Sequence, residues 1–246
     1  MRVVSFDVFD TLLVRVQARP TDLFAQLGAE LAAAGLKVPA PAAFAAARQQ
    51  AELAARRTAP GGEVTLAEIY AALAPALGWD EATRATAQQR ELALEERSLR
   101  PVPAMQSRVA TARAAADAVW FLSDMYLPAA LLERVLRREG FFREGDRLFV
   151  SGEHRASKHR GDLFVKARAQ AGQAITDWLH LGDNPHADDA VPRAQSIRTE
   201  LWQDAVLNRY EQLVLTRAGG LQPPSAASAR TKTSRPSTAG QRDAPD

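Results

Sequence analysis

The 246-residue sequence contains no cysteine, which excludes disulfide frameworks, cysteine-ligated zinc sites and cysteine nucleophiles. It has no excess of either charge, because 31 lysines and arginines stand against 29 aspartates and glutamates, and this balance gives no support to a strongly basic nucleic-acid-binding surface. It also lacks any run of the roughly 20 apolar residues that span a bilayer, and acidic residues come too early for a signal peptide. We therefore expect a cytoplasmic protein with no membrane span and no nucleic-acid partner.

Apolar residues make up 46% of the chain, which is enough for a sizeable core, and they are arranged in two contrasting ways. The β-branched and aromatic run from Arg2 to Phe9 predicts a strand that is buried on both faces of a parallel sheet. Residues 17–103 are alanine-rich instead, and their spacing and end signals predict helices over 22–34, 41–57, 66–77 and 80–98.

From Met105 onward, helical and strand patterns alternate, which is typical of a doubly wound parallel sheet. The expected strands cover 118–122, 147–150, 178–181 and 197–201. The expected helices cover 105–116, 128–139, 162–170, 189–195 and 204–216. We therefore predict an α/β fold with a core of residues 1–16 and 104–218, an inserted helical domain of residues 17–103, and a disordered tail of residues 219–246.

Polar residues come directly after the apolar runs VVSF, VWFL, LFV and LHLG of four expected strands. They are Asp7 and Asp10, Ser123 and Asp124, the segment from Ser151 to Lys158, and Asp183 with Asn184. The carboxyl ends of parallel strands meet at one edge of a sheet, so these residues are expected to converge. Asp7 and Asp183 would repel each other unless a cation lay between them, and Mg²⁺ takes carboxylate oxygens. Lys158 would neutralise a nucleophile or phosphate and Ser123 would hold phosphoryl oxygens, which outlines a phosphoryl-transfer site.

Four segments carry a resemblance to a known family. SFDVFDTLL, FLSD, SGEHRASKHRGDLF and HLGDNPHADD resemble, in the same order, the four motifs of the haloacid dehalogenase-like (HAD) hydrolase superfamily. The resemblance covers roughly residues 1–200 and implies a Rossmann-like core, with the helical insertion where the family places its cap. The longer segments FLSDMYLP and LFVSGEHRASKHRGDLF resemble a bacterial branch associated with glycosyltransferases of surface-polysaccharide pathways, which implies a partner in such a pathway.

The resemblance also implies roles for individual residues. Asp7 would be the nucleophile that forms an aspartyl-phosphate, which water then hydrolyses, and Lys158 would orient it. Ser123 would bind the transferring phosphoryl group. The candidates for binding substrate or phosphate are Ser123, Asp124, Thr11 and Asn184. The implied Mg²⁺ ligands are Asp7, the backbone carbonyl of Phe9, Asp183 and Asp188. Asp188 is preferred to Asp189 for this role.

One position departs from the family pattern. The family's phosphatases carry a general acid and base two residues after the nucleophile, where this sequence has Phe9, followed by Asp10. Alternation along a strand would send Asp10 to the face opposite Asp7, but a turn at Asp10 would let it take the missing role. Without that group a phosphatase would be slowed by roughly 10²- to 10⁴-fold.

Three functions stay open. The first is a magnesium-dependent phosphatase that acts on a small phosphorylated metabolite, with Asp7, Lys158 and Asp10 as catalytic residues. The second is a catalytically weak accessory domain of a polysaccharide or glycosyltransferase system, which Phe9 favours. The third is a metal-independent 2-haloacid dehalogenase, since a halide leaves without a proton, but Asp183 and Asp188 argue for a metal. The histidines fit no metal or nucleophile pattern and are expected at the surface or in loops: His154, His159, His180 and His186.

Overall fold

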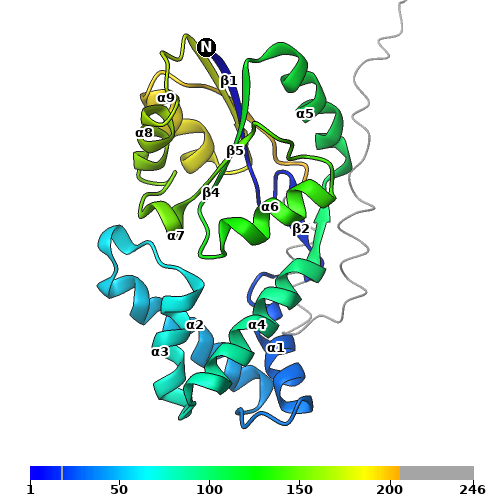
Figure 1. The fold of residues 1–246 in the computed structure, drawn as a ribbon, viewed down its shortest axis with the longest axis vertical. Helices are drawn as coiled ribbons and strands as arrows, with labels where there is room; N and C mark the ends of the chain where they lie inside the picture. The colour runs from blue at the N-terminus through cyan, green and yellow to red at the C-terminus, as the bar shows by residue number, and fades with distance from the viewer. Residues whose placement is uncertain (18, 206–246) are drawn as a thin grey trace, which may run out of the picture.

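The computed structural model of the protein describes residues 1–17 and 19–205. These residues form a sheet with flanking helices and, below it in Figure 1, a group of helices that is inserted between two strands of the sheet part. Apart from residues 204 and 205, the helix expected over 204–216 lies outside the described residues, as does the whole tail expected over 219–246.

The sheet has five parallel strands in the order β5-β4-β1-β6-β7. The strands are β1 (Arg2–Asp7), β4 (Ala118–Ser123), β5 (Arg147–Val150), β6 (Asp177–Gly182) and β7 (Arg198–Leu201). The chain builds outward from β1 on one side through β4 and β5, and then on the other side through β6 and β7. The point where the order reverses, beside the central β1, is where open α/β sheets bind their ligands. The predicted parallel α/β fold is therefore confirmed.

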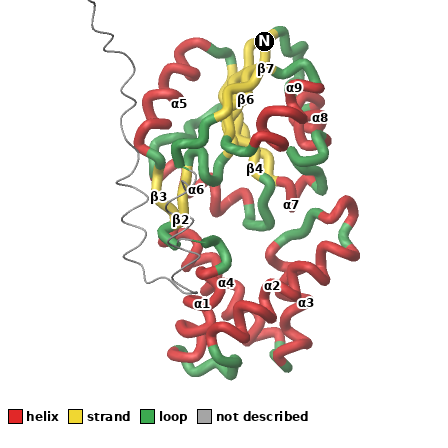
Figure 2. Tube along the Cα trace, turned by 180° about the vertical axis from the view of Figure 1, so that it is seen from behind, coloured by secondary structure: helices red, strands yellow, loops and turns green. Residues whose placement is uncertain are grey.

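Helices cover both faces of this sheet, which explains why β1 is apolar on both sides. Phe6 belongs to an apolar cluster with Val109 of α5, whereas Val3 belongs to a second cluster with Phe164 of α8. Figures 1 and 2 show α5 on the side of the sheet opposite to α8 and α9. The helices of this part are α5 (Pro103–Ala115), α6 (Ala129–Arg138), α7 (Ser151–His154), α8 (Asp162–Ala169), the π-helical turn η2 (Pro185–Ala190) and α9 (Val191–Ala194).

The inserted segment folds into helices close to those expected. They are α1 (Asp22–Ala33), α2 (Pro41–Thr58), the short 3₁₀ helix η1 (Pro60–Gly62), α3 (Leu66–Leu77) and α4 (Glu81–Ser98). The bounds of α3 follow from local chemistry, because Thr65 and Glu68 form a reciprocal capping box at its start and Gly78 ends it in the left-handed conformation. Between α2 and α4, the fully buried Arg48 forms two hydrogen bonds of 3.0 and 2.8 Å with Glu91.

A pair of short antiparallel strands connects the two parts (Figure 2). They are β2 (Leu13–Arg15), through which the chain leaves the sheet part, and β3 (Leu99–Pro101), through which it returns. This pair was not predicted, because three-residue strands are too short to show an alternation of apolar and polar residues.

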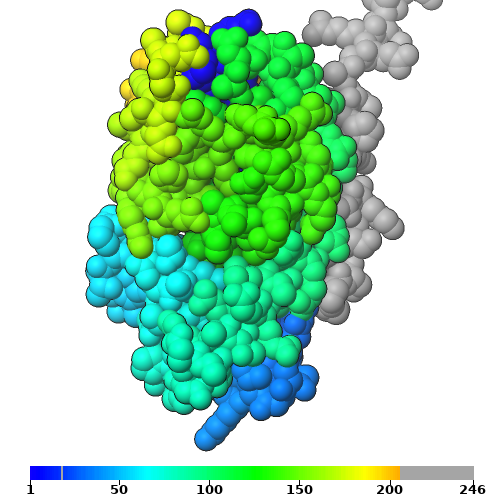
Figure 3. All heavy atoms as spheres, viewed as in Figure 1, coloured from blue at the N-terminus to red at the C-terminus, as the bar shows by residue number. Residues whose placement is uncertain are grey.

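The helical part also packs against the loops at the carboxyl edge of the sheet, and Figure 3 shows the two parts in contact. The Leu66 N–H at the start of α3 donates to the carbonyl of Tyr126 over 2.9 Å. Gly152 lies so close to the Val64 carbonyl that an added Cβ would be 2.3 Å from its oxygen. The Arg155 guanidinium, bound to Glu68 at 2.9 Å, lowers the pKa of that carboxyl to about 2. None of the described helices has the length and hydrophobicity needed to cross a membrane.

Candidate active site at the carboxyl edge of the sheet

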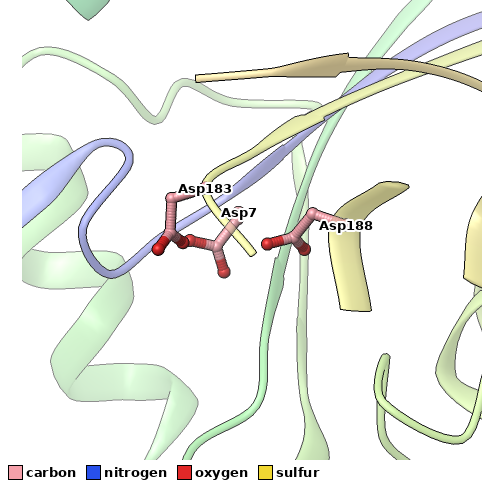
Figure 4. Close-up of side chains that lie close together, drawn as sticks. All are labelled: Asp7, Asp183 and Asp188. Atoms are coloured by element: carbon pink, nitrogen blue, oxygen red, sulfur yellow. The ribbon is translucent and has the colours of Figure 1, made fainter. Parts of the chain in front are cut away.

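Three carboxylates meet where β1 and β6 end. Asp7 is the last residue of β1, Asp183 directly follows β6, and Asp188 lies in the turn η2. Figure 4 shows their side chains pointing toward one another, and one carboxylate oxygen from each lies within 4.8 Å of the others. Asp7 and Asp188 are buried and Asp183 is half-buried. The structure thus brings together three of the four predicted metal ligands.

The chain folds back after β6, so that Asp188 in η2 lies against Gly182 at the end of β6. An added Cβ on Gly182 would lie 2.3 Å from the Asp188 Cγ, so only glycine permits this approach. The Asn184 side chain accepts hydrogen bonds from the backbone N–H groups of His186 and Ala187 at 2.9 and 3.0 Å. The backbone N–H of Asn184 donates to Asp188 Oδ2 at 3.0 Å. In this structure Asn184 therefore shapes the turn that carries Asp188.

Asp189, the alternative to Asp188, lies apart from the cluster. Its carboxylate is bound by Arg193 at 2.8 Å and accepts a hydrogen bond from the Thr199 hydroxyl. It therefore stabilises the region of α9 and β7.

Lys158 connects two of the three carboxylates. Its side chain is only 3% exposed, and its ammonium donates to Asp7 Oδ1 and, over 2.5 Å, to Asp188 Oδ1. The backbone of its loop is held by Asp124, whose carboxylate accepts from the N–H groups of Lys158 at 2.7 Å and of His159 at 3.0 Å. Asp124, a candidate for binding substrate, thus fixes the position of Lys158.

The electrostatics of this cluster follow from burial and from the excess of negative charge. Burial raises the pKa of Asp7 well above its usual value, although Lys158 acts in the opposite direction. Burial and the charges of Asp188 and Asp10 raise the pKa of Asp183 to about 6. Burial opposes ionisation of Asp188, but Lys158 and a hydrogen bond from His180 outweigh it and hold its pKa below the usual value. For Lys158, burial is outweighed by the charges of Asp188 and Asp7, which raise its pKa.

The donor set fits a divalent cation. Asp7 Oδ2 is buried and has no hydrogen-bond partner among the described residues. One ammonium faces three carboxylates here, so a further positive charge would relieve their repulsion. Carboxylate oxygens are the ligands of a hard ion such as Mg²⁺.

The chain turns immediately after Asp7, so the strand expected to reach Phe9 was predicted two residues too long. The N–H groups of Leu12 and Leu13 both donate to the Val8 carbonyl, at 3.0 and 2.8 Å, and Asp10 has a left-handed φ of 58°. Strand alternation therefore does not apply at Asp10, whose charge reaches the Asp183 carboxyl and raises its pKa. The chain therefore turns at Asp10, and the role of Asp10 beside Asp7 stays a prediction.

Phe9 is engaged in packing beside this turn. The guanidinium of Arg15 lies 4.4 Å from the centre of its ring. Arg15 in turn forms a buried pair with Glu95 of α4, with distances of 2.9 and 3.0 Å. This contact joins the loop after β1 to the inserted helices, and neither Arg15 nor Glu95 was singled out from the sequence.

The remaining predicted residues, Ser123 and Thr11, are both buried. Ser123 ends β4, the strand beside β1, one position beyond the Asp7–Leu122 pair. The Thr11 hydroxyl has no hydrogen-bond partner among the described residues, so an uncompensated polar atom lies in the loop after Asp7.

The expectation for the histidines was wrong for His180. It lies within β6, is fully buried, and hydrogen-bonds to Ser5 Oγ at 2.7 Å and to Asp188 Oδ1 at 3.0 Å. The signal was its position in the run WLHLG, where alternation places it on the same face of the strand as Trp178. His159 and His186 are exposed, and their ring centres are 4.5 Å apart.

Comparisons with known proteins identify the fold. No protein-family model matches the sequence, and no curated protein matches it significantly. Among solved structures, a 2-haloacid dehalogenase from Pseudomonas syringae pv. tomato DC3000 is 17% identical with a TM-score of 0.63, over 89% of this chain and 100% of that chain. The HAD-hydrolase YfnB from Bacillus subtilis, bound to magnesium, is 18% identical with a TM-score of 0.56, over 84% of this chain and 90% of that chain.

A HAD family enzyme from Bacteroides thetaiotaomicron is 14% identical with a TM-score of 0.56, over 87% of this chain and 98% of that chain. Similarity at this level of identity establishes the fold and leaves the reaction open. The chain therefore has the fold of the HAD hydrolases.

Proposed function

We propose that the protein is a magnesium-dependent phosphatase that hydrolyses a small phosphorylated metabolite through a phosphoryl group on Asp7. The observation that carries this proposal is the cluster itself. A buried carboxylate with one unpartnered oxygen lies within reach of two further carboxylates, and the Lys158 ammonium holds its other oxygen.

The chain's own groups would act in two steps. In the first, an oxygen of Asp7 forms a bond to phosphorus, and the bond from phosphorus to the ester oxygen breaks. In the second, water adds to phosphorus, the bond to Asp7 breaks, and inorganic phosphate leaves. Lys158 fixes the orientation of Asp7 throughout, and Ser123 and Thr11 offer hydroxyl groups to the phosphoryl oxygens.

Asp7, Asp183 and the Phe9 carbonyl would hold the magnesium ion, with Asp188 assisting. When bound, the ion would supply positive charge that offsets the carboxylates and the phosphoryl group. Asp10 would give a proton to the departing oxygen and take one from the attacking water. Its place in the turn, close enough to influence Asp183, supports this role.

Residues 17–103 would act as a cap that selects the substrate. A cavity of about 410 Å³ lies between the inserted helices and the loop after β4, and it is lined by residues that include Arg15, Phe24, Arg56 and Tyr126. This lining is mixed, with two guanidinium groups, two aromatic rings and the carboxylate of Glu52, which binds Arg56 at 3.0 Å, and it suits a polar organic leaving group such as a sugar.

A second candidate is a metal-independent 2-haloacid dehalogenase, which would use Asp7 to displace a halide. Phe9 favours it, because it stands where a phosphatase would carry an acid, and so does the similarity of fold to the Pseudomonas dehalogenase. The negative cluster of three carboxylates favours the phosphatase. Phe9 equally favours a catalytically weak accessory domain. The cytoplasmic location and the glycosyltransferase-pathway partner stay predictions from the sequence.

One set of assays separates these functions. Phosphate release from a panel of phosphomonoesters is measured with Mg²⁺ and with EDTA, beside halide release from 2-haloacids. The phosphatase predicts Mg²⁺-dependent phosphate release that Asp7→Asn abolishes. Halide release that persists in EDTA would establish the dehalogenase instead, and Mg²⁺ binding without turnover would establish the accessory domain.

A further inference from the structure

Behind the carboxylate cluster, a buried chain of hydrogen bonds runs through the sheet. Trp178 Nε1 donates to Ser5 Oγ over 2.8 Å, Ser5 Oγ lies 2.7 Å from His180 Nδ1, and His180 Nε2 lies 3.0 Å from Asp188 Oδ1. All four side chains are at most 3% exposed.

Adjacent strands create this arrangement. Ser5 of β1 and His180 of β6 are directly paired in the sheet register. Ser5 is two residues before Asp7, so the two share a face of β1, and Trp178 and His180 share a face of β6 in the same way. The surroundings are apolar: the Phe164 ring meets the His180 ring edge-on at 5.0 Å. Polar side chains on such a face are retained only where each is hydrogen-bonded.

The donors and acceptors allow one assignment for a neutral imidazole. Asp188, bound to Lys158, accepts hydrogen bonds, so the proton between it and His180 belongs to His180 Nε2. Nδ1 is then an acceptor, and its partner is the hydroxyl proton of Ser5. The indole N–H of Trp178 can only donate a hydrogen bond, and Ser5 Oγ accepts it. The Ser5 hydroxyl is then free to donate its own proton to His180 Nδ1.

We propose that Trp178, Ser5 and His180 are positioning residues that fix the Asp188 carboxylate, and through it Lys158, beside Asp7. Asp188 Oδ1 accepts hydrogen bonds from both His180 and Lys158. The position of this one oxygen therefore determines where the Lys158 ammonium lies. The network deepens the proposed function, on which it rests, because the same carboxylate assists the metal.

The test uses the full-length protein and begins without metal. Long-range ¹H–¹⁵N NMR spectra report the tautomer of His180, and the expected result is a protonated Nε2 and an unprotonated Nδ1. Ser5→Ala and Trp178→Phe should weaken this preference, whereas Ser98→Ala, at a buried serine in the inserted helices, should leave it unchanged. A protonated Nδ1 with an unprotonated Nε2 in the wild-type protein would overturn the proposal.

Magnesium affinity, measured by titration calorimetry, gives the second readout. His180→Leu should weaken Mg²⁺ binding by about tenfold or more, as removal of groups that orient metal ligands does. His180→Gln, whose amide N–H can replace the Nε2 donor, should restore most of it. Equal affinities in wild-type, His180→Leu and Ser5→Ala proteins would overturn the proposal, as would equal losses in His180→Leu and His180→Gln.

Two further outcomes remain decisive. If His180→Leu does not fold, the His180 tautomer and the Mg²⁺ affinity of Ser5→Ala are compared with those of Ser98→Ala instead. If the wild-type protein binds no Mg²⁺, the proposed function fails, and the tautomer of His180 still decides the inference because it needs neither metal nor substrate.

Discussion

The replacement of Gly182 by alanine tests whether the position of Asp188 in the carboxylate cluster requires glycine at residue 182. The new Cβ would lie 2.3 Å from the Asp188 Cγ, and ordinary contact begins at 3.4 Å, so Asp188 or its backbone must move by about 1 Å. Asp188 Oδ1 lies 2.5 Å from Lys158 Nζ and 3.0 Å from His180 Nε2. A shift of this size would break at least one of these bonds.

Two losses are expected from Gly182→Ala. Overpacking should lower the free energy of unfolding by about 1–3 kcal/mol. Misplacement of Asp188 should weaken Mg²⁺ binding by about 10- to 100-fold. Thermal unfolding and titration calorimetry on the same protein samples measure the two effects separately.

Gly152→Ala is the matched control. Its Cβ would also overlap an atom at 2.3 Å, but that atom is the Val64 carbonyl oxygen in the inserted part. The Gly152→Ala protein should lose as much stability as the Gly182→Ala protein, but it should keep most of its Mg²⁺ affinity. If Gly182→Ala binds Mg²⁺ as tightly as the wild-type protein, or if both variants lose affinity equally, the reasoning about Asp188 is refuted.

Three further predictions concern the carboxylates. Asp7→Asn should reduce phosphate release to background while the protein stays folded by circular dichroism, and residual turnover would contradict the role of Asp7. Asp10→Asn should lower kcat by roughly 10²- to 10⁴-fold if Asp10 is the acid and base; an unchanged kcat and pH profile would show that it is not. Because the pKa of Asp183 is raised to about 6, protons compete with the metal below that pH. The Mg²⁺ dissociation constant should then rise at least about tenfold for each pH unit further down, because burial raises the pKa of Asp7 as well, and Asp183→Asn should make this dependence less steep.

The raised pKa of Asp183 also makes the stability of the metal-free protein depend on pH. Its folded state binds the proton more tightly than the unfolded chain does, so this group's contribution to stability is present at low pH and is lost as pH rises through about 6. Bound Mg²⁺ would offset that loss.

Much of the fold follows from the sequence because its signals are local and strong. The helix Leu66–Leu77 and the strand Arg147–Val150 have the bounds expected from periodicity and end residues. The convergence of Asp7, Lys158 and Asp183 follows as well, because the carboxyl ends of parallel strands must meet at one edge.

Other features depend on contacts between distant segments, which a single sequence does not carry. The β2–β3 pair exists because residues 13–15 and 99–101 meet after an insertion of more than 80 residues between them. The end of β1 at Asp7 depends on hydrogen bonds of the following turn to Val8. His180 lies within the expected strand 178–181, but its burial depends on hydrogen bonds to Ser5, which is 175 residues away in the sequence, and to Asp188.

The central claim is that Asp7 becomes phosphorylated, and single-turnover labelling tests it most directly. The full-length protein is mixed with Mg²⁺ and phosphomonoesters, sugar phosphates among them, quenched in acid and digested for peptide mass spectrometry. A phosphoryl group is expected on the peptide that contains Asp7, and it should be absent from Asp7→Asn and from samples with EDTA. Phosphate release by the wild-type protein with no phosphoryl group on that peptide would contradict it.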